Sequence, residues 1–253
     1  MTWIKSMVIA FAMYSKIPMP RIEWNNKNMK YSLCFFPLIG VVIGVLMCGW
    51  WVLSERLSFG VLMRAAIACM IPVLVSGGIH LDGLLDTVDA LSSYQPREKK
   101  LEILKDPHTG AFAIIGCVMY FILYLGSFTE VVSIKVCIIV SIGFVLSRAL
   151  SGMSLVLFKS AKKEGLLYAF SSTAHRQITC IMLFIIILSC GSAMIYLDTV
   201  MGVALLMAAG LVFLYYRKMS YKQFGGITGD LAGFFLQICE LVMIITAVLI
   251  SKI

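Results

Sequence analysis

Charged residues are scarce in this sequence. Asp, Glu, Lys and Arg make up only 13% of its 253 residues, whereas hydrophobic residues make up 60% and the mean hydropathy is +0.96. Soluble domains carry about 25% charged residues because their surfaces face water. The composition therefore excludes an ordinary soluble domain and indicates a chain that lies mostly in a lipid bilayer.

Several other signals are also missing. No segment alternates polar and apolar residues as the strands of a membrane barrel do, and no internal repeat or linker divides the chain. The eight cysteines form no Cys-x-x-Cys pair and lie within or beside apolar runs, which is typical of small packing residues. No small-residue cleavage site follows an uninterrupted apolar stretch in residues 1–17, so we expect an interfacial segment there rather than a cleaved signal peptide.

Long apolar runs are the main feature that is present. A helix that crosses the ~30 Å hydrocarbon core needs about 20 apolar residues, and its backbone polar groups must be satisfied within the chain. We therefore predict an all-α, polytopic membrane helical bundle of about seven transmembrane helices, formed by residues 1–253 as a single domain. The seven runs are Leu33–Leu53, Phe59–Ile79, Thr109–Phe128, Val136–Phe158, Ile178–Leu197, Thr199–Tyr216 and Leu231–Ile250.

The positive charges predict how the bundle is oriented. If the N-terminus is cytoplasmic, sixteen of the 21 Lys and Arg residues fall in cytoplasmic segments, and only Arg56, Lys135 and Lys252 fall outside. The positive-inside rule then predicts a cytoplasmic N-terminus and an external C-terminus, in the cell inner membrane. The net charge of +8 does not indicate a nucleic-acid partner, because the basic residues form no single patch with interleaved aromatic residues.

Glycines predict one close helix contact. Gly40 and Gly44 form a Gly-x-x-x-Gly step within the first long run, and Gly49 extends this face of small residues. Such a face allows two helix backbones to approach closely, so we expect tight packing there. The step also permits a homo-oligomer without requiring one.

Acidic residues are concentrated in one short segment. Asp82, Asp86 and Asp89 occur at positions i, i+4 and i+7, which on an α-helix lie within about 60° of one another. Like charges on one helix face repel, and a divalent cation would compensate them directly. Oxygen ligands suit Mg²⁺, with Mn²⁺ as an alternative, so the spacing predicts a metal site on these three residues. The plainer interpretation is a solvated helix end whose acids pair with nearby lysines, but leucine and valine side chains fill the other faces.

His80 precedes this acidic face. On a helical wheel it lies nearly opposite Asp82, so it is not expected on the same stripe. Two roles fit it equally: a general base or substrate contact, and a hydrogen-bonded histidine at the membrane interface.

A glycine-rich turn comes just before the last apolar run. Gly225, Gly226, Thr228 and Asp230 lie in this turn, which opens onto a helix. Such turns offer backbone N–H groups to an anion, so these residues are candidates for substrate binding.

Two ionisable residues lie within predicted spans. Arg148 and Glu240 are candidates for substrate binding, because an ionisable group in a membrane usually faces a polar cavity or a partner. The structural alternative is an ion pair of Glu240 with Arg148 or with Arg64.

Cations near the acidic segment are candidate phosphate contacts. Lys105 lies beside Asp106, and Lys162, Lys163 and Arg176 follow in the next cytoplasmic segment. They could bind phosphate oxygens that a metal ion leaves unneutralised. The plainer interpretation is that most lysines in this set are only topology determinants.

Three separated motifs can be compared with known families. They are Ser76-Gly-Gly-Ile-His-Leu-Asp-Gly-Leu-Leu-Asp-Thr-Val-Asp-Ala-Leu91, Leu101-Glu-Ile-Leu-Lys-Asp-Pro-His-Thr-Gly110, and Gly225-Gly-Ile-Thr-Gly-Asp230 with Glu240. Together they resemble one enzyme family, the adenosylcobinamide-GDP ribazoletransferases, or cobalamin-5′-phosphate synthases. The resemblance extends from Ala10–Pro20, similar to the family's Arg/Lys-Ile-Pro segment, to the last apolar run. The sequence departs from the family pattern at Ala111–Ala113 and at Ala161–Gly165.

The resemblance implies a transferase that acts in the last steps of vitamin B12 assembly. The 5′-hydroxyl or 5′-phosphate of α-ribazole would attack the cobinamide-linked phosphorus of adenosylcobinamide-GDP, and GMP would leave. Mg²⁺ on the three aspartates would supply charge neutralisation and alignment. One carboxylate or His80 would take the hydroxyl proton, with Lys105 and Asp106 in the catalytic group. Asp106, Asp230 and Glu240 would hold a second metal or orient ribazole.

Two other functions compete with this one. A CDP-alcohol phosphotransferase also places spaced aspartates at the cytoplasmic ends of membrane helices, but its Asp-x-x-Asp-Gly-x-x-Ala-Arg pattern is not matched here. An ion-coupled transporter could use Asp230, Glu240 and Arg148. Against it, the acids gather near one membrane face, and no paired interrupted helices indicate an inverted repeat. We therefore expect an enzyme whose active site faces the cytoplasm.

Overall fold

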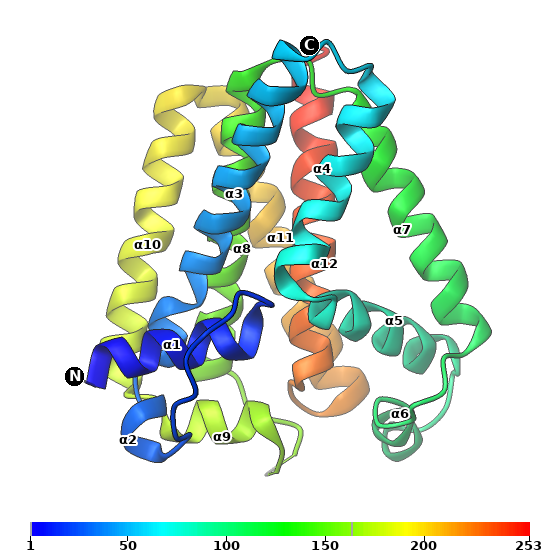
Figure 1. The fold of residues 1–253 in the computed structure, drawn as a ribbon. Coiled ribbons are helices and arrows are strands. Elements are labelled where there is room, and N and C mark those ends of the chain that lie inside the picture. The colour runs from blue at the N-terminus through cyan, green and yellow to red at the C-terminus, as the bar shows by residue number, and fades with distance from the viewer. Residues whose placement is uncertain (1, 163) are drawn as a thin grey trace.

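The computed structural model describes residues 2–162 and 164–253, and within them twelve helices and no strand are found (Figure 1). This confirms the predicted all-α fold. The helices are α1 (Thr2–Tyr14), α2 (Asn26–Met29), α3 (Ser32–Arg56), α4 (Val61–Ser76), α5 (Ile79–Ser92), α6 (Arg97–Ile103), α7 (Ala111–Thr129), α8 (Ile134–Leu157), α9 (Leu166–Thr173), α10 (Arg176–Leu197), α11 (Thr199–Phe224) and α12 (Gly229–Ile250).

Six of these helices are long and apolar enough to cross a membrane, namely α3, α7, α8, α10, α11 and α12. They coincide with six of the seven predicted runs. The remaining run, Phe59–Ile79, contains α4, which joins α5 at an angle of 95° to make a seventh, bent candidate. Gly77 and Gly78 form the bend with φ of +66° and +80°, values that glycine adopts without the penalty of a Cβ. The acidic helix α5 therefore leaves the direction of α4 and runs across the end of the bundle (Figure 1).

The centre of the bundle is formed by α3 and α8, which meet at glycine. A Cβ on Gly40 would lie only 2.8 Å from Val145 Cα, and one on Gly44 would lie 3.1 Å from Ser141 O. The predicted close contact of the Gly-x-x-x-Gly step is therefore confirmed. Gly49 has no atom within 4 Å of an added Cβ and lies outside this contact.

The short helices gather at one end of the molecule, opposite the C-terminus (Figure 1). There α1 lies across the bundle, and its 13 residues span only about 20 Å, too little for a ~30 Å hydrocarbon core. The segment after α1 is tied to the end of α4, because Lys16 N–H donates a hydrogen bond to Val75 O at 2.8 Å. This arrangement matches the interfacial segment predicted for residues 1–17, and it brings Tyr14 close to the start of α5.

Candidate functional site

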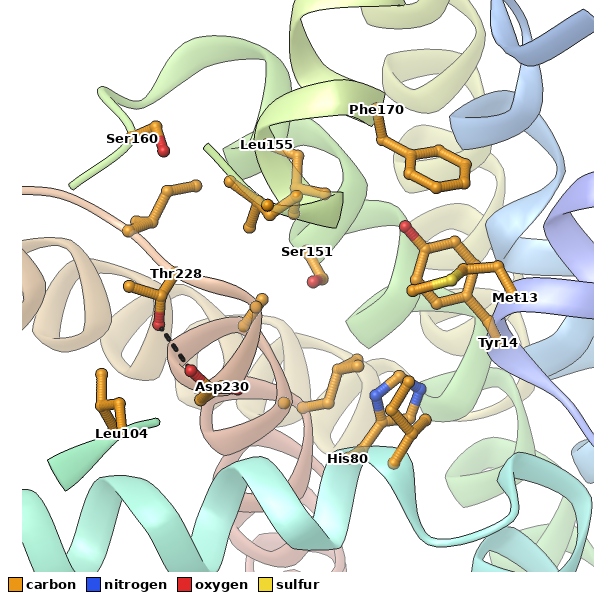
Figure 2. Close-up of a pocket in the computed structure, with 18 of the residues that line it drawn as sticks. Met13, Tyr14, His80, Leu104, Ser151, Leu155, Ser160, Phe170, Thr228 and Asp230 are labelled. Atoms are coloured by element: carbon orange, nitrogen blue, oxygen red, sulfur yellow. Dashed lines mark hydrogen bonds between the residues drawn. The ribbon is translucent and has the colours of Figure 1, made fainter. Parts of the chain in front are cut away.

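A cavity of about 320 Å³ lies at this end of the bundle, where α1, α5 and α9 meet the beginning of α12 (Figure 2). Its polar lining comes from residues that are far apart in the sequence. They are His80, Asp82, Lys105, Ser151, Ser160, Lys162, Glu164, Thr228 and Asp230. Six of the predicted site residues are therefore brought together by the fold, namely His80, Asp82, Lys105, Lys162, Thr228 and Asp230.

Glycines bring α5 against α12 at this cavity. A Cβ on Gly83 would lie 2.6 Å from Asp230 O and 2.9 Å from Asp230 Cα, and one on Gly233 would lie 3.0 Å from His80 O. The two backbones approach this closely because neither glycine has a side chain. Asp82 is thereby placed beside the first turn of α12, which carries Asp230.

The acids of α5 and α12 form one electrostatic group. The pKa of Asp86 is raised to about 7, mainly by burial and then by the negative charges of Asp82, Asp230 and Asp89, in that order of importance. Asp89 lies at the far side of this group, where its carboxylate would be overlapped by a Cβ on Gly110. The predicted acidic face is thus real, and Asp230 joins it from a second helix.

These acids do not by themselves provide a complete set of metal ligands. No three His, Cys, Asp or Glu side chains within residues 2–162 and 164–253 are arranged so that they could hold a metal ion together. Asp82 borders the cavity, whereas Asp86 and Asp89 do not. Any metal ion here would have to draw its remaining ligands from water or from a substrate.

The turn before α12 is held in place by the segment after α8. Ser160 and Ile227 form a parallel bridge, and Ala161 N–H donates to Ile227 O at 2.9 Å. Gly226 permits this contact, because an added Cβ would lie 2.6 Å from Ala161 N. Similarly, a Cβ on Gly225 would overlap the guanidinium group of Arg97. Both glycines are needed for packing, and neither lines the cavity.

Thr228 and Asp230 do face the cavity (Figure 2). Thr228 is the N-cap of α12, where its Oγ1 accepts a hydrogen bond from Leu231 N–H at 3.2 Å and donates one to Asp230 Oδ2 at 3.3 Å. The beginning of a long helix carries a partial positive charge that favours anions. This end of the cavity therefore combines a carboxylate with an electropositive helix end.

Two lysines border the cavity on its charged side. Lys105 Nζ forms an ion pair with Glu164 Oε1 at 3.0 Å, and this hydrogen bond raises the pKa of Lys105. Lys162 Nζ donates to Leu101 O at 3.0 Å, while burial lowers the pKa of Lys162. Both ammonium groups lie in the region where a phosphate would need compensation. The predicted contact at Lys163 lies outside the described residues.

Asp106 differs from its neighbour Lys105. Its carboxylate accepts hydrogen bonds from His108 N–H at 2.9 Å and contacts His108 Nδ1 at 2.7 Å, and these interactions lower its pKa. The side chain is 52% exposed and does not line the cavity. In this structure Asp106 shapes the loop before α7.

His80 lies in the wall of the cavity and is 5% exposed. Burial, followed by the positive charge of Arg148, lowers the pKa of His80 to about 3, so its ring is neutral near pH 7. The ring packs 5.8 Å from that of Phe36, and its Nε2 has no hydrogen-bond partner among the described atoms. Although His80 and Asp82 point in different directions from α5, the cavity extends around the start of that helix and reaches both.

Arg148 and Glu240 pair with each other inside the bundle. Arg148 Nη1 and Glu240 Oε1 are 2.7 Å apart, and the two side chains are 1% and 2% exposed. Ser147 Oγ donates to the same carboxylate oxygen at 2.8 Å. Neither residue of the pair lines the cavity. Of the two predicted partners for Glu240, the structure selects Arg148, while Arg64 pairs with Glu55 at 2.5 Å.

Several lining side chains are absent from the candidates predicted from the sequence, among them Tyr14, Phe36, Ser151 and Phe170. Apolar aromatic residues and a serine within apolar runs have no local pattern that distinguishes them from core residues. Only Tyr14 carries a signal, because it lies in the Ala10–Pro20 segment that contributes to the family resemblance.

Comparisons with known proteins agree with one another. The family model described as cobalamin-5-phosphate synthase matches residues 6–248. A Lachnoclostridium phytofermentans protein named adenosylcobinamide-GDP ribazoletransferase is 48% identical over 241 residues, which cover 95% of this chain and 92% of that protein.

Proteins of the same name occur among more distant relatives. One from Clostridium botulinum strain Alaska E43 is 30% identical over 98% of both chains, and one from Geobacillus strain WCH70 is 31% identical over 86% of this chain and 84% of its own. No solved structure matches this chain.

Proposed function

Since the chain belongs to the cobalamin-5-phosphate synthase family, we propose that it is a membrane transferase that joins adenosylcobinamide-GDP to α-ribazole or its 5′-phosphate and releases GMP. The observation that carries this proposal is the convergence of Asp82, Asp230, Lys105 and Lys162 on one cavity. Phosphoryl transfer requires that the phosphate charges be compensated and the reacting groups be aligned. Carboxylates and ammonium groups around one cavity can do both.

The transfer exchanges one P–O bond for another. A ribose hydroxyl oxygen of the nucleoside forms a bond to the cobinamide-linked phosphorus, the P–O bond to the second phosphate breaks, and that phosphate leaves with guanosine as GMP. In the 5′-phosphate of α-ribazole the 5′-oxygen is already esterified, so another ribose hydroxyl attacks. The proton of the attacking hydroxyl passes to a carboxylate. Asp82 is the better candidate for this base, because it borders the cavity and because the low pKa of His80 makes the imidazole a weak base.

Magnesium is the metal that the acidic group fits best, with Mn²⁺ as an alternative. All donors are carboxylate oxygens, and the mutual repulsion of Asp82, Asp86, Asp89 and Asp230 calls for a cation. Mg²⁺ is usually held by one or two carboxylates together with water and substrate phosphates, so a site completed only by substrate is compatible with these side chains. Bound there, the ion would neutralise phosphate charge and help to align the leaving group.

The active site is proposed to face the cytoplasm, in the inner membrane. Helices α1, α2, α5, α6 and α9 lie at the same end as the cavity, and the segments at this end carry most of the Lys and Arg residues (Figure 1). Nucleotide-activated substrates are cytoplasmic, and the amphiphilic corrinoid could lie in the interface beside the cavity.

The test is release of GMP by purified protein in detergent or nanodiscs, given both substrates with Mg²⁺ or with EDTA. We expect Asp82→Asn and Asp86→Asn each to lower turnover by about 10²-fold or more, since metal charge stabilisation contributes several kcal/mol to such reactions. Glu98→Gln changes an exposed acid of α6 at the same end and serves as the control.

Two results would contradict different parts of this proposal. If both aspartate variants kept full Mg²⁺-dependent turnover, the metal assignment would be wrong. If folded wild-type protein released no GMP under any metal condition, the transferase assignment would be wrong.

A further inference from the structure

One end of the cavity is aromatic. Tyr14 of α1, Phe36 of α3, His80 of α5 and Phe170 of α9 come from four helices and all border the cavity. The ring centroids of Tyr14 and Phe36 are 4.3 Å apart, those of Tyr14 and Phe170 are 5.9 Å apart, and those of Phe36 and His80 are 5.8 Å apart. Phe36 and Phe170 are 2% and 0% exposed, so these rings are fixed by packing rather than free at a surface.

The charged groups lie at the other end. In Figure 2, Tyr14 and Phe170 are on one side of the open space, and Thr228 and Asp230 are on the opposite side. A ligand that fills the cavity therefore contacts aromatic side chains at one end and the polar groups proposed to act on phosphates at the other. Nucleosides have this same division, with a flat base joined to a hydroxyl-bearing sugar.

From this division we infer that the aromatic end binds the base of the nucleoside substrate, so that the ribose hydroxyls lie toward Asp82 and Asp230. This inference rests on the proposed function and adds to it the position of one substrate. Tyr14 and His80 offer suitable faces, because their rings are tilted by only 24° to each other with centroids 6.5 Å apart. Aromatic side chains bind bases by stacking, since every base has a π face.

The size of the cavity favours the nucleoside over the corrinoid. Small-molecule sites usually measure about 300–1,000 Å³, and a cavity of about 320 Å³ lies at the lower limit of that range. This is room for a base with its ribose and not for a corrin ring that also carries a nucleotide. The corrinoid must therefore present its diphosphate from outside.

The polar atoms at the aromatic end favour a largely apolar base. The hydroxyls of Tyr14 and Ser151 point into the space and could donate to one or two ring nitrogens (Figure 2). Burial raises the pKa of the Tyr14 phenol, which keeps it protonated as a donor. Guanine carries several donors and acceptors along its edges, and burying them here would leave some unpaired at a free-energy cost. The guanine of the second substrate is thus a poor fit for this end.

The experiment compares Phe36→Leu and Phe170→Leu with Phe128→Leu, a buried phenylalanine of α7 that does not line the cavity. Leucine keeps an apolar side chain but removes the flat face. Stacking contributes about 1–3 kcal/mol per base, so we expect roughly a 5- to 150-fold rise in KM and in Kd for α-ribazole in the first two variants. KM for adenosylcobinamide-GDP should stay within about twofold of wild type in all three variants.

Equilibrium binding of radiolabelled α-ribazole separates this inference from the proposed function, because it requires no turnover. If the two cavity variants bound α-ribazole as tightly as Phe128→Leu while GMP release continued, the base site would be wrong and the transferase would stand. A rise only in KM for adenosylcobinamide-GDP would instead place the guanine on these rings and overturn the inference. If wild-type protein neither bound α-ribazole nor released GMP, both would fail.

A second variant covers the case in which loss of a buried ring unfolds the protein. Tyr14→Phe removes one hydroxyl and keeps the ring, so thermal unfolding should be little changed. We expect weaker binding of α-ribazole and unchanged binding of ribose 5-phosphate, which lacks a base. Equal loss for both ligands, or for neither, would count against a base contact at Tyr14.

Discussion

The contact between α5 and α12 yields a sharp prediction, because one methyl group should separate the helices that carry the acids. In Gly83→Ala the new Cβ would lie 2.6 Å from Asp230 O. Heavy atoms in optimal contact are about 3.5 Å apart, so the helices must separate by ~0.9 Å. Overpacking of this kind costs about 1–3 kcal/mol, which lowers stability without exhausting the 5–15 kcal/mol typical of a folded protein. A ~1 Å displacement of catalytic groups can cost about 10²-fold in rate.

We therefore expect Gly83→Ala to lose about 10- to 100-fold in kcat/KM for GMP release while its thermal unfolding midpoint falls by a few degrees. Gly210→Ala in α11 is the matched control, because an added Cβ there meets no atom within 4 Å. Alanine also has the higher helix propensity, so this control should be as stable as wild type or slightly more stable. If Gly83→Ala matched Gly210→Ala in both rate and stability, the close crossing of α5 and α12 would not be what positions the acids.

Two further predictions concern the core of the bundle. Glu240→Ala leaves the Arg148 guanidinium buried without its counter-charge and should lower the free energy of unfolding in detergent by about 3–5 kcal/mol. Glu130→Ala breaks a half-exposed ion pair with Lys252 and should lower it by at most ~1 kcal/mol. Equal losses would show that the Arg148–Glu240 pair is solvated. Gly40→Ala should destabilise the protein by about 1–3 kcal/mol through its contact with α8, while Gly49→Ala, on the same helix but in open space, should not; thermal unfolding of the two variants side by side decides this.

The bundle could be predicted from the sequence because membrane helices are specified locally. Run length and charge placement are enough to find α3, α7, α8, α10, α11 and α12. The break after Ser76 could not be placed this way, since apolar residues continue to Ile79 and the turn depends on the positive φ of Gly77 and Gly78. The family resemblance stated from three motifs is confirmed by the match over residues 6–248.

Only the parts of the site that lie within one helix could be predicted from the sequence. Spacing within α5 identifies Asp82, Asp86 and Asp89 as one face, because the period of a helix is known. The approach of Asp230 depends on where two helices cross, which a single sequence does not reveal. The aromatic residues Tyr14 and Phe170 are harder still, because their position follows from α1 and α9 closing over the cavity.

Depth along α12 explains why its two acids have different surroundings. Glu240 lies ten residues beyond Asp230, which at ~1.5 Å per residue places it about 15 Å deeper, near the middle of a ~30 Å hydrocarbon core. A carboxylate at that depth is retained only with a partner, and Arg148 supplies one at 2.7 Å. Asp230, at the end of the helix, forms no ion pair within residues 2–162 and 164–253; it lies near the ammonium group of Lys162 and near the acids of α5. Under the proposed function, a cation that enters with a phosphate would relieve this repulsion. The same helix thus carries a buried ion pair at its centre, which holds the bundle together, and a group of repelling acids at its end, where substrate would bind.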